Sequence, residues 1–200
     1  LNTRNTQKYF FSGFRVFSGL NYMKNEQISE FLQSRIEAND FPSAVYLVAE
    51  RGGIVFQDAL GLAIVEPVKS EARLDTIYDL ASLTKVLVTG LICAKLIEKG
   101  EINLSDKISK HFAEFETDEK REITIENLLT HTSGFAAWKP FYLISNFKSE
   151  ISNLIASETL ANPVTAKVVY SDLNFLILAS LLEKIYGSPI DDIAKREVFA

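Results

Sequence analysis

A long apolar segment, Val86–Ile97, restricts the possible folds of this 200-residue chain more than any other feature. It is apolar on nearly every side of a helix, and Gly100 follows where a glycine commonly ends one. Such a helix belongs at the centre of a fold. Ser82 and Lys85 stand one helical turn apart at its start. They are either a capping serine with a solvated lysine, or a nucleophile with its proton acceptor.

Size and charge exclude some classes of function. With 200 residues, 47% of them hydrophobic, the chain can form one large domain or two small ones. The net charge of -5, the pI near 5.2 and the lack of a dense Lys/Arg stripe argue against nucleic-acid binding. No apolar run is long enough to span a bilayer. We therefore expect a soluble protein with no nucleic-acid partner and no membrane span.

The first 24 residues differ from the remainder. They begin with Leu and carry four basic residues, and Arg15 interrupts the apolar run "YFFSGFRVF", so no clear signal peptide is present. We treat residues 1–24 as a tail of unknown role and residues 25–200 as one domain. The single cysteine, Cys93, lies inside the apolar helix and is expected to be a packed core thiol. The cellular compartment stays open.

The first half of the domain, residues 25–80, predicts a helix and strands. Residues Glu26–Ala38 place apolar side chains at helical spacing. The stretches "SAVYLVAE" and "IVFQDAL" surround Arg51-Gly52-Gly53 and read as a tight hairpin. A lone hairpin is barely stable in water, so flanking helices are expected to cover it. Residues Leu62–Tyr78 read as an irregular connection.

The second half, residues 81–200, predicts the apolar helix and a helical subdomain. Thr124 is placed to cap a short helix, and a strong helix covers Asp172–Tyr186, stopped by Gly187. Two strands followed by successive helices indicate a mixed α/β (α+β) fold, with an antiparallel sheet flanked by helices. Because the chain stops at "REVFA" without a cap, we expect the fold to be incomplete at its C-terminus.

The Ser82–Lys85 pair suits nucleophilic catalysis. A serine hydroxyl needs a base within hydrogen-bond reach, and residues three apart on a helix share one face. Burial would lower the pKa of the lysine, so that its neutral amine accepts the serine proton. The same spacing recurs at Ser145 and Lys148, and about one match is expected by chance in such a chain. Only Ser82 opens a strong helix.

Three segments carry a family resemblance: "YDLASLTKVLVT", "ITIENLLTHTSGF" and "VVYSDLNFLILASLLEKIYG". In this order they resemble the serine β-lactamase-related superfamily, which includes class C β-lactamases, penicillin-binding DD-peptidases, D-aminopeptidases and esterases. The resemblance covers Glu26 to the end. It implies a β-lactamase/transpeptidase-like fold and a serine hydrolase that acts through an acyl-enzyme on an ester, D-amino-acid peptide or β-lactam carbonyl. Family members are often periplasmic or secreted.

The resemblance assigns roles to three residues. Ser82 matches the acylated serine, Lys85 the lysine of S-x-x-K, and Tyr170 the tyrosine of Y-x-N, which relays protons. The alternative for Tyr170 is an ordinary buried tyrosine, and a rival register at Ser171–Leu173 lacks the final amide of an S-D-N triplet. The implied partner is a small-molecule or peptide substrate. No cofactor and no metal is implied, since no Cys/His/Asp cluster has ligand spacing.

Asp172 departs from the family pattern, which has Asn at this place. Asp172 is the candidate substrate-binding residue, but a carboxylate accepts hydrogen bonds and donates none, so it is not expected to donate to a substrate amide carbonyl as the asparagine would. If Asp172 reaches Lys85, it holds the lysine cationic and leaves the role of base to Tyr170. The alternative for Asp172 is a helix N-cap.

A second departure is that no K-T-G or H-x-G triplet follows Tyr170 before the chain ends. The His131–Gly134 loop is no substitute, because it precedes Tyr170. His131 is expected to fix that loop, and His111 to lie on the surface. We therefore expect this chain alone to be inactive or nearly so and the full-length product to be the enzyme, an esterase or peptidase rather than a resistance enzyme. The competing interpretation is a non-catalytic module of the same fold that binds peptidoglycan-like or acyl ligands.

Overall fold

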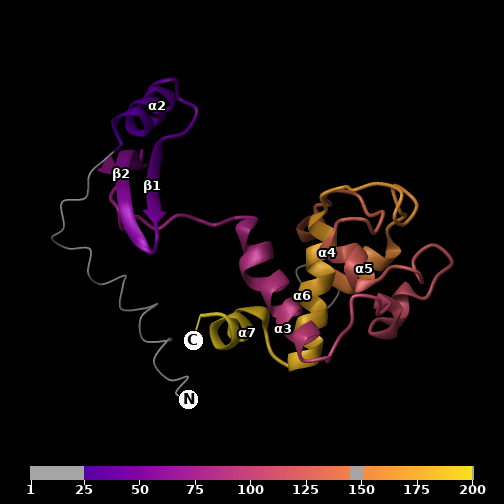
Figure 1. The fold of residues 1–200 in the computed structure, drawn as a ribbon. Coiled ribbons are helices and arrows are strands. Elements are labelled where there is room, and N and C mark those ends of the chain that lie inside the picture. Colours follow the sequence, from indigo (N-terminus) through magenta and orange to yellow (C-terminus); the bar gives the residue numbers. More distant parts are fainter. Residues whose placement is uncertain (1–24, 145–150, 200) are drawn as a thin grey trace, which may run out of the picture. The chain divides into compact units, whose positions relative to one another are not determined.

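The computed structural model describes residues 25–144 and 151–199, and the chain divides into two compact units at Asp79/Leu80 (Figure 1). Each unit is treated by itself below. The second S-x-x-K pair, Ser145 and Lys148, lies outside the described residues. Within the described ranges, no helix combines the length and the apolar character that crossing a membrane requires.

The first unit contains one helix and a three-stranded antiparallel sheet in the order β1-β2-β3. The elements are α2 (Glu26–Glu37), β1 (Ser43–Glu50), β2 (Gly53–Ile64) and β3 (Ser70–Glu71). Arg51 and Gly52 connect β1 to β2 with φ of 51° and 80°, the left-handed conformations of a two-residue hairpin turn. The predicted hairpin is confirmed. The prediction of an irregular connection over Leu62–Tyr78 is partly wrong, because Ile64 at the end of β2 pairs with Ser70 of β3. This pairing uses backbone groups, so it leaves no alternating apolar pattern in the sequence.

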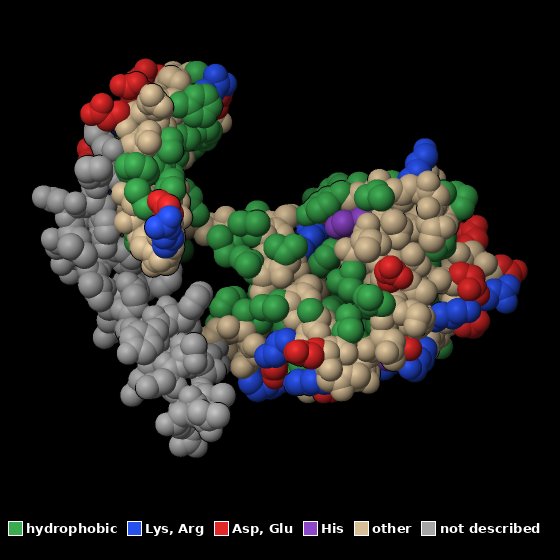
Figure 2. All heavy atoms as spheres, viewed as in Figure 1, with side chains coloured by type: hydrophobic (Ala, Val, Ile, Leu, Met, Phe, Trp, Pro, Cys, Tyr) green, Lys and Arg blue, Asp and Glu red, His purple; other side chains and the backbone are tan. Residues whose placement is uncertain are grey.

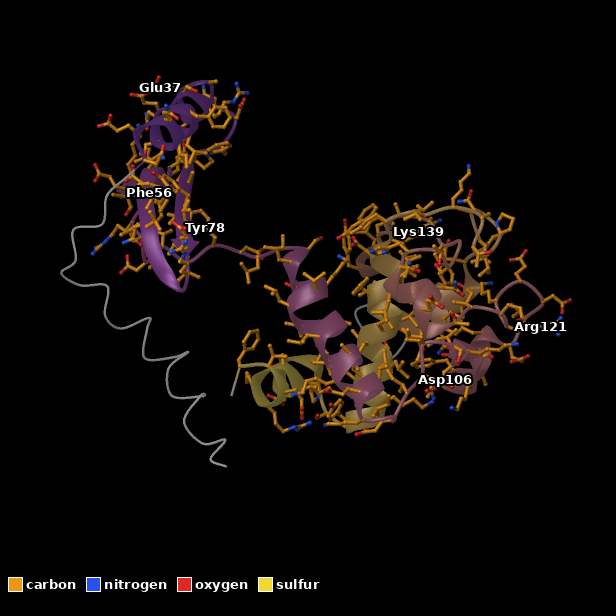
Figure 3. The ribbon with its side chains drawn as sticks, viewed as in Figure 1. Glu37, Phe56, Tyr78, Asp106, Arg121 and Lys139 are labelled. Atoms are coloured by element: carbon orange, nitrogen blue, oxygen red, sulfur yellow. The ribbon has the colours of Figure 1, made fainter. Side chains whose placement is uncertain are left out.

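Polar contacts anchor α2 in this unit. Asn25 caps the helix by accepting a hydrogen bond from the Ile28 amide. The Ser29 hydroxyl donates to Asp58 Oδ2 at 2.7 Å, although an apolar stripe is what the sequence predicts to face the sheet. Tyr78, labelled in Figure 3, belongs to the last residues of this unit, and its hydroxyl lies 2.9 Å from Oγ of Ser43 at the start of β1.

The second unit is helical. Its elements are η2 (Lys85–Gly90), α3 (Leu91–Glu98), η3 (Ile108–Lys110), η4 (Ala113–Phe115), α4 (Ile125–Leu129), η5 (Phe141–Leu143), α5 (Ile151–Ser157), α6 (Asp172–Tyr186) and α7 (Ile190–Glu197). Thr124 caps α4 as predicted, and α6 ends at Gly187 with φ 64°. The core gathers around α6, which buries residues such as Ile177, Leu178 and Leu181.

The apolar helix is the continuous pair η2 and α3, and it is buried on one face only. Ile92, Cys93 and Leu96 are fully buried in the core. Val86 and Leu91 on the other face are 61% and 44% exposed, and Figure 2 shows hydrophobic side chains on this surface. Within the helical unit, the other elements therefore cover this helix on one face only, not on all sides as the sequence predicts for the fold. Its first part, η2, is π-helical, a rare form often found at functional sites.

Candidate active site

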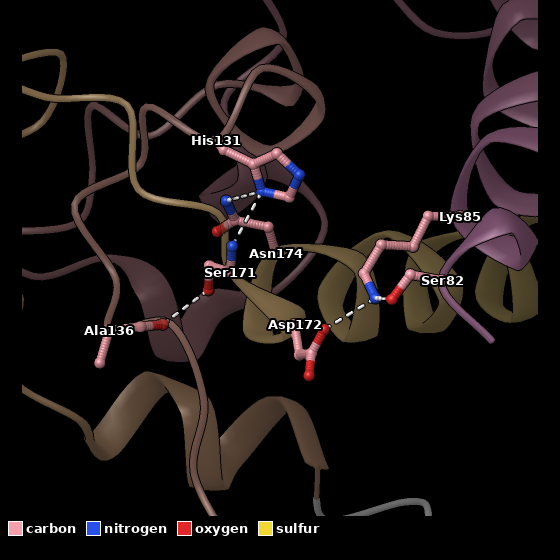
Figure 4. A network of polar contacts seen from close by, with 7 residues as sticks. All are labelled: Ser82, Lys85, His131, Ala136, Ser171, Asp172 and Asn174. Carbon is pink, nitrogen blue, oxygen red and sulfur yellow. Dashed lines mark hydrogen bonds and ion pairs between the residues drawn. The ribbon is translucent and has the colours of Figure 1, made fainter. Parts of the chain in front are cut away.

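Lys85 lies at the centre of the candidate site. Its Nζ is 2.7 Å from Asp172 Oδ1 and 3.3 Å from Ser82 Oγ (Figure 4). The same Nζ lies 5.2 Å from the centroid of the Tyr170 ring. The structure thus brings together all four residues that the sequence nominates, although Tyr170 and Asp172 are more than 80 positions from Lys85 in the chain.

The surroundings of Lys85 keep it protonated. Burial alone would lower its pKa, but hydrogen bonds to Asp172 and Tyr170, together with the charges of these groups, outweigh burial and raise the pKa. The expected neutral amine is therefore wrong, and the conditional expectation that Asp172 reaches Lys85 is met. Asp172 is the first residue of α6 rather than its N-cap, a position that Ser171 occupies.

Tyr170 borders the site from the segment before α6. It is 53% exposed, so it is not an ordinary buried tyrosine. Its ring lies next to the imidazole of His131, with 4.6 Å between the ring centroids. His131 in turn lies 5.2 Å from the Phe175 ring, so its ring contacts both aromatic residues.

A buried polar network, which the sequence analysis did not predict, lies next to Tyr170. The Ser133 hydroxyl donates to Asn174 Oδ1 at 2.6 Å, and Asn174 Nδ2 lies 3.3 Å from His131 Nδ1. The Ser171 hydroxyl donates to the Ala136 carbonyl at 2.7 Å (Figure 4). Asn174 is fully buried, and a lone amide within the apolar run Leu173–Ala179 is the signal that could have indicated it.

A cavity of about 750 Å³ opens beside Ser82 and Lys85. Apolar residues of α6 and the aromatic side chains of Trp138 and Tyr142, whose rings lie 6.3 Å apart, line much of it. The charged residues of its lining are paired. Besides Lys85 with Asp172, Lys139 lies 2.8 Å from Glu158. Asp191 lies 3.2 Å from Lys195.

The remaining reactive side chains lie outside the site. Cys93 is buried as predicted, and burial raises its pKa to about 12, which removes it as a nucleophile. His111 is half-buried rather than on the surface, and its backbone carbonyl accepts a hydrogen bond from Lys184 of α6. Among the described residues, no group of three His, Cys, Asp or Glu side chains is arranged to hold a metal ion.

Curated relatives match most of this chain. A protein of Salmonella typhimurium (strain LT2) named "Putative D-alanyl-D-alanine carboxypeptidase" is 30% identical over 203 residues, which covers 90% of this chain and 46% of that protein. One of the same name from Escherichia coli (strain K12) is 28% identical over 204 residues, covering 91% and 46%. The chain thus spans about half the length of the curated relatives it matches.

Solved structures share the fold. A class C β-lactamase from Rhodobacter sphaeroides superimposes with a TM-score of 0.74 at 20% identity, covering 88% of this chain and 48% of that one. EstCE1, described as a hydrolase with promiscuous acyltransferase activity, gives 0.75 at 23% identity, covering 86% and 50%. These similarities confirm the predicted β-lactamase/transpeptidase-like fold. Since the Beta-lactamase family model matches residues 28–200, the chain belongs to the Beta-lactamase family.

Proposed function

We propose that this chain carries the nucleophile of a serine hydrolase that acts through an acyl-enzyme. The observation that supports it is the position of Lys85 Nζ, which contacts Ser82 Oγ and Asp172 and lies beside Tyr170. A nucleophile and a phenol grouped around one fixed cation are the kinds of group that acyl transfer needs. The names of the curated relatives and of EstCE1 agree with hydrolysis of an acyl group.

In the proposed reaction, Ser82 Oγ attacks the substrate carbonyl carbon and forms a tetrahedral oxyanion. Because Asp172 holds Lys85 as an ammonium, the Ser82 proton is relayed by the Tyr170 hydroxyl, whose oxygen accepts that proton as it gives up its own. Tyr170 thereby protonates the leaving group, and the acyl group stays on Ser82. In deacylation, water attacks the acyl carbon, its proton passes to Tyr170, and Ser82 Oγ is released with that proton.

The cavity favours an uncharged, apolar acyl group. Aromatic and aliphatic side chains next to Ser82 provide apolar contact area, and Lys139, which is already paired with Glu158, is poorly suited to bind a free carboxylate. Asp172, unlike the family asparagine, cannot donate to an amide carbonyl. Both observations support an ester in preference to a β-lactam.

One observation favours the competing function, a binding module without turnover. The 2.7 Å ion pair with Asp172 occupies Lys85, which is then no proton acceptor for Ser82. A module of this kind would hold an acyl ligand in the cavity and form no covalent adduct.

A fluorophosphonate probe on the full-length gene product separates the two functions. We expect mass spectrometry to find the adduct on Ser82, and Ser82→Ala to abolish it. Ser105→Ala, which changes an exposed serine outside the cavity, is the matched control and should label like the parent. Ligand binding without any adduct would support the binding module and contradict the hydrolase. The expected near-inactivity of the 200-residue chain alone stays a prediction, which turnover of a chromogenic ester would contradict.

A further inference from the structure

We propose that His131, in its neutral form, is a positioning residue that clamps Tyr170 beside Lys85, and that protonation of His131 releases the clamp and switches the site off. This inference rests on the proposed function, in which Tyr170 moves the Ser82 proton. It assigns to His131 a role that its place in a loop far from Tyr170 in sequence does not indicate.

Three contacts of His131 converge on one stretch of chain. Its backbone carbonyl accepts a hydrogen bond from the Val169 amide at 2.9 Å. Its Nδ1 accepts one from the Ser171 amide at 3.1 Å. Its ring lies 4.6 Å from the ring of Tyr170. The residues on both sides of Tyr170 and the tyrosine ring itself are therefore held by a single histidine.

The hydrogen bonds fix the tautomer of this histidine. A backbone N–H can only donate, so Nδ1 must accept from Ser171 and carries no proton. Asn174 supports this assignment, because its Oδ1 accepts the Ser133 hydroxyl at 2.6 Å and its amide group therefore faces His131 Nδ1. The proton of the neutral ring lies on Nε2. A proton added to Nδ1 would face two N–H groups, so the ring cannot become cationic without breaking both contacts.

The groups around His131 also favour the neutral ring. Lys85 on η2 faces it as a cation, and Asp172 on α6 as an anion, while Tyr170 and Phe175 contact the ring faces. Burial first and the Lys85 charge second lower the pKa of His131, and Asp172 opposes them with a smaller effect. Protonation of His131 therefore breaks its two hydrogen bonds and is also opposed by burial and by the charge of Lys85.

The backbone of His131 determines which substitutions can test the clamp. Its φ is 59°, a left-handed conformation in which Asn is well tolerated and Ala is strained. In His131→Asn, the amide oxygen can take the place of Nδ1 as acceptor for Ser171, and the side chain does not titrate. In His131→Gly the backbone is relaxed but the acceptor and the ring are lost.

The test measures the rate of Ser82 labelling by a fluorophosphonate against pH, in the full-length protein and both variants. The parent should lose labelling on acidification with a midpoint below 6.5, the ordinary pKa of histidine. His131→Asn should keep labelling and lack this acid limb. His131→Gly should label more slowly at every pH, by up to about 100-fold, because Tyr170 is no longer held in place. An acid limb unchanged in His131→Asn would overturn the proposal, since a merely structural role leaves the midpoint where it is.

Nuclear magnetic resonance of the imidazole nitrogens in the Ser82→Ala protein gives a readout that needs no activity. The signals that disappear in His131→Asn are assigned to His131. We expect an Nε2–H tautomer with a midpoint below 6.5. An Nδ1–H tautomer, or a midpoint at or above that value, overturns the clamp whatever the labelling shows. Absence of labelling at Ser82 in the parent overturns the proposed function instead, so the two failures are distinguishable.

Discussion

The two units of this chain differ in what stabilises them. In the helical unit, the buried apolar cluster runs from Val88 to Ala194 and includes many side chains with no exposed surface. In the sheet unit, among the described residues, Ala72 is the one buried apolar side chain, and Ser29 and Gln57 are the buried polar ones. Backbone pairing and polar contacts such as Ser29 to Asp58 organise the sheet unit.

This difference indicates which unit can hold catalytic side chains in fixed positions. A site is only as well positioned as the elements that carry it, and close-packed interiors hold side chains in single rotamers. Ser82, Lys85, His131 and Tyr170 all belong to the helical unit. The following predictions test the contrast between the units, from the largest expected effect to the smallest.

A leucine truncation in each unit should give the largest difference. Leu181 is fully buried on α6, and we expect Leu181→Ala to lower the free energy of unfolding by about 2–5 kcal/mol, because it leaves a cavity. Leu47 on β1 is 53% exposed, and Leu47→Ala should cost about 0.5 kcal/mol or less. Amide hydrogen exchange measured in each unit gives both changes in stability, and urea unfolding followed by the fluorescence of Trp138, the single tryptophan, adds a second readout for the helical unit. Equal shifts in both variants would refute the contrast in packing.

Removing one carboxylate from an ion pair in each unit compares a partly buried ion pair of the helical unit with an exposed one of the sheet unit. Asp172→Asn should lower the pKa of Lys85, because burial then acts without its main opposing partner. The alkaline limb of Ser82 labelling should move to lower pH. Glu50→Gln breaks a pair with Arg51 whose side chains are 68% and 92% exposed, so the same profile should not change. A profile unaffected by Asp172→Asn would mean that Lys85 titration does not control labelling.

Acid should weaken the helical unit through its histidines. His111 and His131 both have lowered pKa values, with burial as the first cause in each. Between the folded pKa and 6.5, the unfolded chain binds more protons than the folded one, so stability falls as the pH drops through this window. The urea midpoint seen by Trp138 should decrease accordingly, and His111→Gln should reduce the decrease. The sheet unit's described residues contain no histidine, and its unfolding should not follow this dependence.

The smallest effect is expected at the hairpin turn. Arg51 has φ 51° in a position that favours Asn before Gly52. Arg51→Asn should therefore stabilise the sheet unit by about 0.5 kcal/mol or less, and Arg51→Ala should give no gain, since Ala also resists a left-handed conformation. Amide hydrogen exchange along β1 and β2 measures the difference. A gain with Ala equal to that with Asn would contradict the left-handed turn.

Particular residues show how much could be predicted from the sequence. The α6 helix begins at Asp172 and ends at Gly187 as expected, because its apolar periodicity and its C-terminal glycine are local signals. Thr124 caps α4 for the same reason. The exposed face of η2 and α3 could not be predicted, since hydrophobicity states what a side chain favours and not which neighbours are there to cover it. The pairing of β2 with β3 likewise depends on backbone groups that carry no sequence signal.

The sequence by itself determined the residue types of the site: a serine and a lysine one turn apart, a tyrosine before a strong helix, and the fold family that unites them. Only the tertiary structure decided their protonation and their supports. Asp172 lies against Lys85 and keeps it cationic, and His131 holds the residues around Tyr170. The physical reason is that pKa values and orientations depend on distances of a few ångströms between groups far apart in the chain, which only the folded structure defines.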